Sequence, residues 1–248
     1  MYRIESNELL IDDISFEEAE RIQIKYSKFI QDKKTNNKII QSLGQISILA
    51  GVDVSYYLKN NSEYGVSCAV LWDLKDNKII ETSFAQGKIN FPYKAGFLGF
   101  RESKLISLAI KNASLKPELI VCDGHGFNHP RRFGEAVQIG LALNIPSFGI
   151  AKNPFFGYSD WKSVIRKKGQ KVPIWAFNPN ESIVDNEIIG YSICLAEGRR
   201  PSFISIGYDI TLDTAITIAL KTSLKNRQPE PLRLADKFSR AKIKKFYI

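Results

Sequence analysis

Apolar and β-branched residues are concentrated in three neighbouring segments near the start of the chain, and short polar turns separate these segments. The segments are ISILAGVDVSYY (46–57), GVSCAVLWDL (65–74) and IIETSFAQGKI (79–89). Runs of this length and composition are typical of strands, and turns as short as NNSEYG (60–65) join antiparallel neighbours. The pattern therefore predicts a three-stranded antiparallel meander.

Segments with a helical period alternate with short apolar runs in the middle of the chain. Residues 97–114 and 132–144 are predicted to be helices, whereas residues 117–124 and 145–152 are predicted to be buried strands. Strands that alternate with helices usually pair in parallel. We therefore expect an α/β fold with a mixed central sheet, in which parallel strands follow the three antiparallel ones and helices flank the sheet.

Further elements lie toward the two ends of the chain. Residues 16–33 predict a helix, with Ser15 as its N-cap and Glu18 completing a capping box. The later segments predict a hairpin followed by a helix, at residues 188–197, 202–210 and 211–224. Because no repeat, low-complexity tract or linker interrupts the pattern, we expect residues 1–248 to form a single domain.

The composition points to a polyanionic partner. Lys and Arg number 35 against 26 Asp and Glu, for a net charge of +9. Much of this charge lies in residues 221–248, which hold nine basic and two acidic side chains, and in the basic segment 161–171. A solvated basic face without a partner would carry the same signal. The three cysteines form no paired motif, the first residues lack a signal-peptide pattern, and no apolar run could span a bilayer, so we expect a cytoplasmic protein without a membrane partner.

Three carboxylates stand out because each lies in or beside an apolar run. Asp53 interrupts the first strand, and a buried acid is costly unless it is paired or binds a metal. Glu102 shares the apolar stripe of its helix with Leu98. Asp123 ends a strand of the parallel region, where ligands collect in open α/β sheets. Turn positions would also explain the two aspartates, and a salt bridge to Arg101 would explain Glu102.

The order of these elements and acids is that of a ribonuclease H-like fold. A meander whose first strand carries an acid is followed by a helix with an inward acid and then by a strand that ends in an acid. Carboxylates without a histidine or cysteine set suit Mg²⁺ or Mn²⁺ rather than zinc. Such an ion can activate water for attack on a phosphodiester, and the basic segments would attract one.

Five sequence blocks together resemble the endonuclease V family, the deoxyinosine-directed nucleases, over residues 45–240. The blocks, which follow one another in the family's order, are GVDVS (51–55), FPYKAGFLGFRE (91–102), DGHGFNHPRRFG (123–134), GIAK (149–152) and PEPLRLAD (229–236). Each block is a weak signal by itself. The second and third are long and unusual, so the set of five is specific.

The resemblance implies roles for individual residues. Asp53 and Asp123 resemble the family's metal-binding aspartates, and Glu102 resembles its third catalytic acid, so these three would hold Mg²⁺, with Mn²⁺ as a substitute. Lys152 resembles the catalytic lysine that contacts the phosphate near the scissile bond. The expected reaction is hydrolysis of the second phosphodiester on the 3′ side of the lesion, leaving 3′-hydroxyl and 5′-phosphate ends, as a step of DNA repair.

The same resemblance assigns residues that bind DNA. Pro92 and Tyr93 resemble the wedge that enters the duplex at the lesion, where an aromatic ring can stack on bases. The backbone around Gly124 and Gly126 would line the pocket for the flipped hypoxanthine. Two further residues, Arg131 and Arg132, are expected to face phosphate. We expect a monomer whose partner is DNA that contains deoxyinosine. Inosine RNA is an alternative, because the sequence does not reveal contacts to a 2′-hydroxyl.

Three positions depart from the family's pattern. Tyr208 stands in SIGYDI where a histidine near the metal is expected, and tyrosine is a poor base at neutral pH. Gln138 also replaces a histidine, and Lys94 makes the wedge loop read PYKAG instead of PYIPG. The first two departures leave open a second function, a protein that binds inosine-containing nucleic acid with reduced or no cleavage.

The two histidines of the chain, His125 and His129, suggest a histidine-centred catalytic site at first sight. No serine or cysteine stands in a nucleophile motif near them, and the sequence before Pro130 favours a structural His129. The glycines of DGHG lack both the lysine of a phosphate-binding loop and the spacing of a dinucleotide site. Both alternatives are therefore weaker than the carboxylate site.

Overall fold

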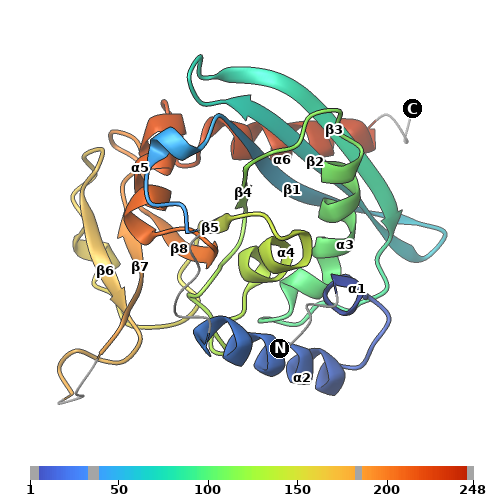
Figure 1. Ribbon diagram of the computed structural model, residues 1–248, viewed down its shortest axis with the longest axis horizontal. Coiled ribbons are helices and arrows are strands. Elements are labelled where there is room, and N and C mark those ends of the chain that lie inside the picture. Colours follow the sequence, from blue (N-terminus) through green and yellow to red (C-terminus); the bar gives the residue numbers. More distant parts are fainter. Residues whose placement is uncertain (1–5, 33–38, 182–185, 245–248) are drawn as a thin grey trace.

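An eight-stranded mixed sheet, in the order β3-β2-β1-β4-β5-β8-β7-β6, forms the centre of the molecule (Figure 1). The computed structural model describes residues 6–32, 39–181 and 186–244. The strands are β1 (Ile48–Lys59), β2 (Ser62–Asp73), β3 (Lys78–Lys88), β4 (Leu119–Cys122), β5 (Ser147–Ala151), β6 (Lys171–Trp175), β7 (Ile188–Ile193) and β8 (Ser202–Tyr208).

The pairing of the strands confirms the predicted sheet. β1, β2 and β3 form an antiparallel meander, with Asp53 opposite Cys68. β4 pairs in parallel with β1 on one side and with β5 on the other. β7 and β8 form the predicted hairpin, and β8 joins β5 in the antiparallel sense.

Helices cover both faces of the sheet. They are α1 (Ser6–Leu9), α2 (Phe16–Asp32), α3 (Leu98–Lys111), α4 (Glu135–Leu143), α5 (Leu212–Thr222) and α6 (Glu230–Lys244), with single turns of 3₁₀-helix at Leu43–Gln45 and Trp161–Ser163. α5 and α6 bury apolar side chains on one face, and α3 and α4 do so on the other. α1 and α2 lie over α3 and α4 as a further layer (Figure 1). The predicted N-cap of α2 is confirmed, since the amide of Glu18 donates to Ser15 Oγ at 3.2 Å.

β6 and α6 are the longest of the elements that the sequence left unassigned, which also include α1 and the two 3₁₀ turns. β6 is an edge strand that contains Pro173, a residue tolerated there because an edge strand has unpaired amides. α6 is rich in charge, so its apolar stripe, which includes Leu232 and Ala235, is narrow. It nevertheless packs along β1 and β2, directly behind Asp53. Of the helices that the structure describes, none combines the length and apolarity needed to cross a membrane.

Candidate active site

Two aspartates lie side by side at the centre of the sheet. The parallel register pairs Val52 of β1 with Cys122 of β4. Asp53 directly follows Val52, and Asp123 directly follows Cys122. A third parallel strand adds a lysine, because Lys152 directly follows β5. Its Nζ donates to Asp123 Oδ2 at 2.6 Å. The middle of β1 and the carboxyl ends of β4 and β5 thus bring together three of the four predicted catalytic residues.

Glu102 reaches the same place from α3. It is buried, and its carboxylate accepts a hydrogen bond from the hydroxyl of Tyr56 on β1. The salt bridge to Arg101 that the sequence left open is not formed, because the Arg101 guanidinium pairs with Glu63 at 2.8 Å. Glu102 therefore faces the sheet, as its position on the apolar stripe of the helix predicted.

A fourth acid, Asp236 on α6, was missed as a site residue by the sequence reasoning. It lines a cavity of about 520 Å³ together with Asp53, Asp123 and Lys152. One turn further along α6, Ser239 Oγ donates to Asp53 Oδ2 at 3.1 Å. The signal was present in the block PEPLRLAD, whose final aspartate stands beside the buried Ala235. α6 is therefore part of the site rather than only a basic tail.

The acids repel one another. Burial and the negative charges of Asp123, Glu102 and Asp236 together raise the pKa of Asp53 to about 8. Burial also raises the pKa of Glu102. Buried carboxylates that destabilise each other in this way are stabilised by a cation.

The donor set fits a hard divalent ion, although the side chains are not arranged around one. Carboxylate oxygens are the ligands that Mg²⁺ and Mn²⁺ prefer. Within residues 6–32, 39–181 and 186–244, no three histidine, cysteine or acidic side chains form a group that could hold a metal as placed. Lys152 and Tyr56 each engage one of the carboxylates. Rotation of these side chains would therefore have to accompany metal binding.

A fifth acid, Glu135 at the start of α4, was also missed. It is 3% exposed, and burial together with the nearby Glu102 raises its pKa well above the ordinary value. A side-chain hydrogen bond with Glu102 is a further cause that raises the pKa of Glu135. An acid in the first turn of a helix usually interacts with the helix dipole, so the sequence alone gave no reason to expect burial here.

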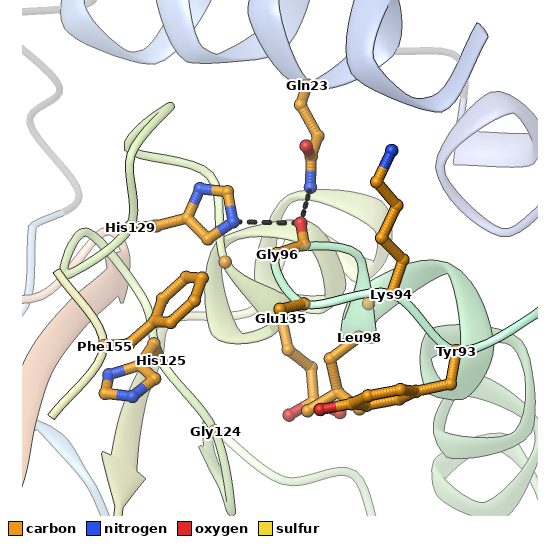
Figure 2. Close-up of a pocket in the computed structure, with 13 residues that line it drawn as sticks. Gln23, Tyr93, Lys94, Gly96, Leu98, Gly124, His125, His129, Glu135 and Phe155 are labelled. Carbon is orange, nitrogen blue, oxygen red and sulfur yellow. Dashed lines mark hydrogen bonds between the residues drawn. The ribbon is translucent and has the colours of Figure 1, made fainter. Parts of the chain in front are cut away.

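A pocket of about 180 Å³ lies directly beside the acids (Figure 2). Gly124, the neighbour of Asp123, and Glu135, the partner of Glu102, both line it. Its other walls include Leu98 at the start of α3, together with Tyr93 and further residues of the loop before this helix. This loop and Gly124 were both expected at the binding site, and they lie together here.

The wedge loop is exposed at its tip and fixed at its end. Pro92 is exposed, and Tyr93 is 75% exposed. At the far end of the loop, the carbonyl of Gly96 accepts hydrogen bonds from Gln23 and His129, both at 2.9 Å (Figure 2). An exposed aromatic on an anchored loop has the geometry that a wedge requires.

Neither histidine is placed to act as a base. Burial lowers the pKa of His125 and of His129 to about 4, so both rings are weak proton acceptors. His129 bonds the Gly96 carbonyl, in agreement with the structural role predicted for it. The His125 ring stacks on Phe155, with the ring centroids 5.6 Å apart.

Gly126 does not line the pocket as expected. Its amide donates to Ser205 Oγ at 2.9 Å and so is not directed at a base. A Cβ added at Gly126 would lie 1.9 Å from the carbonyl oxygen of Ile206, which explains why a glycine is needed here. Gly126 therefore packs the loop against β8, and its expected role in reading the base stays a prediction.

Arg131 and Arg132, which are expected to face phosphate, have partners within the protein. Arg131 donates to Gln23 at 2.6 Å and pairs with Glu20 at 3.0 Å, which ties its loop to α2. Arg132 donates to a backbone carbonyl and pairs with Glu187 at 3.6 Å. Both guanidinium groups are mostly buried and are engaged within the protein, because α2 and the region before β7 supply acids that the local sequence does not reveal.

Tyr208 lies at the end of the β5–β8 pair that is opposite Lys152. It pairs with Ser147, the first residue of β5, whereas Lys152 follows the last residue of that strand. Its hydroxyl donates to Asn144 Oδ1 at 3.0 Å. The expectation that position 208 lies near the catalytic metal is therefore wrong. Gln138, the second departure, is likewise structural, since it is fully buried and bonds the carbonyl of Leu9.

A Tyr208→Phe variant tests this placement. We expect it to cleave at an unchanged rate and to lose about 1 kcal/mol of unfolding free energy, because only a buried hydrogen bond is removed. Urea unfolding and a cleavage assay of the same preparation measure the two effects. A large loss of activity without a loss of stability would place Tyr208 in the catalytic machinery.

The fold and the site define a class of protein, the ribonuclease H-like proteins with a carboxylate cluster beside the central parallel strands. The model of the family described as Endonuclease V matches residues 27–237. The chain belongs to the endonuclease V family.

Individual relatives agree with this assignment. Endonuclease V of Dictyoglomus thermophilum is 34% identical over 229 residues, which cover 92% of this chain and 90% of the relative. The crystal structure of endonuclease V from Bacillus subtilis is similar with a TM-score of 0.83 and 28% identity, covering 97% of each chain. That of Ciona intestinalis endonuclease V, in complex with a 24mer DNA containing an inosine followed by a ribo-adenosine, has a TM-score of 0.72 and 28% identity, covering 92% of this chain and 99% of the other.

Proposed function

We propose that this protein is a metal-dependent endonuclease that cleaves DNA at deoxyinosine. The observation that carries the proposal is the contact between the acid cluster and the pocket. Asp123 and Gly124 are neighbours in the chain, and Glu102 and Glu135 are hydrogen-bonded, so a base held in the pocket would lie beside the acids. The binding of inosine-containing DNA by the Ciona relative supports this choice of substrate.

The metal in this proposal is Mg²⁺, with Mn²⁺ as a substitute. Asp53, Asp123 and Glu102 would hold it, and Asp236 lines the same cavity. When bound, such an ion activates water and stabilises charge on the phosphate. Lys152, which pairs with Asp123 at 2.6 Å, would place its ammonium against the phosphate beside the scissile bond. Tyr56 orients the Glu102 carboxylate through its hydrogen bond.

The pocket and the wedge would select the lesion. An extruded hypoxanthine would enter the pocket beside Gly124, while Tyr93 would fill the gap that it leaves in the stack. Cleavage at the second phosphodiester on the 3′ side, with 3′-hydroxyl and 5′-phosphate products, follows from the family resemblance. A repair role, a cytoplasmic location and a monomeric state remain expectations of the same kind.

A Tyr93→Ala variant is expected to lose about 1–3 kcal/mol of preference for deoxyinosine DNA over undamaged DNA, because base stacking is removed. Competition binding on matched duplexes measures this preference. Tyr158→Ala is the control, because Tyr158 is 50% exposed and does not line the pocket. An equal loss of affinity for both duplexes, with no change in preference, would contradict a wedge.

Inosine RNA is the second candidate substrate, because the DNA bound by the Ciona relative carries a ribonucleotide after the inosine. The test is cleavage of inosine-bearing DNA and RNA side by side, with Mg²⁺, with Mn²⁺ and with a chelator. We expect metal-dependent cleavage of the DNA. Cleavage of the RNA alone would show that inosine RNA is the substrate. Tight binding of inosine-containing nucleic acid without cleavage would support a binding protein. No effect on either nucleic acid would refute the proposal.

A further inference from the structure

Glu135 places a carboxyl group in the wall of the pocket, where the other walls are mainly apolar or glycine. It extends into the pocket from the first residue of α4, while Leu98 enters from the first residue of α3 (Figure 2). The side chain is 3% exposed. A buried carboxyl costs free energy unless its oxygens find hydrogen-bond partners.

One oxygen of this carboxyl lacks such a donor. Glu135 Oε1 is buried and accepts no hydrogen bond from the residues that the structure describes. The other oxygen lies against the backbone of the DGHG loop, since a Cβ added at Gly124 would be 2.4 Å from Oε2. An acceptor oxygen and a glycine backbone therefore stand next to each other in one wall of the pocket.

This pairing matches the hydrogen-bonding edge of a 6-oxopurine. Hypoxanthine presents the O6 acceptor next to the N1–H donor, whereas adenine presents a 6-amino donor next to the N1 acceptor. A backbone N–H at Gly124 can donate to O6, and a carboxyl oxygen can accept from N1–H whether or not the carboxyl group is protonated. Adenine in the same place would direct its N1 lone pair at the carboxyl oxygen. The wall therefore favours the deaminated base and opposes its parent.

We propose that the Glu135 side chain determines specificity by accepting the N1–H hydrogen bond of the extruded 6-oxopurine. This inference rests on the proposed function, because it requires an extruded base in this pocket. The Glu135 side chain would then recognise the base, a task that Asp53, Asp123 and Glu102 do not perform. The contact with Glu102 places this recognition next to the catalytic acids.

The alternative for Glu135 is a role confined to Glu102, in which the two carboxyls only share a proton. The two roles differ in how substrates respond. A group that orients Glu102 affects every substrate equally, whereas a group that reads N1–H affects only bases that carry this donor. The preference between two bases therefore separates the roles, even where the rate on each base changes.

The test compares deoxyinosine with 2′-deoxynebularine, a purine that lacks both O6 and N1–H, in otherwise identical duplexes with Mg²⁺. We expect the wild-type protein to cleave deoxyinosine about 10- to 100-fold faster, because the analogue leaves buried polar groups unpaired. Glu135→Leu should lower this preference about tenfold or more. Glu135→Gln should retain much of it, because the amide oxygen can accept the same hydrogen bond.

A buried polar residue of the same helix provides the control. Gln138→Leu removes an amide that lies outside the pocket, so the preference should not change. An unchanged preference in Glu135→Leu, with both rates lowered alike, would overturn the inference and leave the proposed function standing. Equal cleavage of the two substrates by the wild-type protein would overturn it without any variant. If the wild-type protein cleaves neither substrate, the proposed function itself fails.

Discussion

Asp123→Asn is expected to reduce cleavage of deoxyinosine DNA by at least about a hundredfold, because the charge that holds the metal beside the phosphate contributes several kcal/mol. Asparagine keeps the size of the side chain, so binding of the lesion should be largely retained. Single-turnover cleavage and equilibrium binding, measured on the same duplex, separate the two effects. Undiminished cleavage would remove Asp123 from the metal site.

The stability of Asp123→Asn distinguishes an acid that is needed for function from one that is needed for the fold. Asp53 has a raised pKa in the folded protein, so its ionisation destabilises the fold as the pH rises from about 4 toward 8. Asp123→Asn removes one cause of this loss, although it also removes the ion pair with the half-exposed Lys152. We expect no net fall in the melting temperature at neutral pH. The control is Asp213→Asn, an exposed acid on α5, which should leave cleavage unchanged.

Gly126→Ala is expected to destabilise the protein by about 1–3 kcal/mol or more, because the new methyl group would overlap the backbone of β8. Such a loss lowers the melting temperature of a chain of this size by about 2–4 °C per kcal/mol. The effect should appear in thermal unfolding without DNA, since Gly126 packs the loop rather than reading a base.

Gly44→Ala is the matched control for this prediction. Nothing lies within 4 Å of a Cβ added at Gly44, so the melting temperature should change little. If Gly126→Ala were as stable as Gly44→Ala and had lost its preference for deoxyinosine, the packing role assigned to Gly126 would be wrong. The base-reading role predicted from the sequence would then be supported.

The sequence predicted the central sheet and three of its acids because their signals are local. Asp53 interrupts an apolar strand, Asp123 ends one, and Glu102 lies on an apolar helical stripe. The alternation of strands and helices predicted parallel pairing on one side of the mixed sheet, and β1, β4 and β5 form this part. Asp53 and Asp123 meet at the site because the parallel register places the middle of β1 beside the end of β4.

The residues that were missed or misassigned depend on contacts between distant segments. Asp236 stands in a charged helix and becomes a site residue only because α6 packs on β1 and β2. Glu135 has the position of an ordinary helix-start acid, and its burial depends on α3. The Arg131 side chain is engaged by α2, more than a hundred residues earlier in the chain.

The predicted consequence of Tyr208 failed for a related reason. The motif resemblance located the substitution correctly in the sequence but carried no information about which end of β8 faces the acids. The antiparallel pairing of β5 with β8 places Tyr208 at the end of the sheet away from Lys152. The argument for a protein without cleavage therefore loses its structural basis, while Asp53, Glu102, Asp123 and Lys152 are all present at the site.

The most direct test of the account is product mapping on an end-labelled duplex with one deoxyinosine, incubated with Mg²⁺ or with a chelator. The account predicts a single Mg²⁺-dependent nick at the second phosphodiester 3′ to the lesion, with 3′-hydroxyl and 5′-phosphate ends, and an intact control duplex that carries deoxyadenosine instead. Equal nicking of both duplexes, or no nick with either metal ion on a folded preparation, would contradict the central claim.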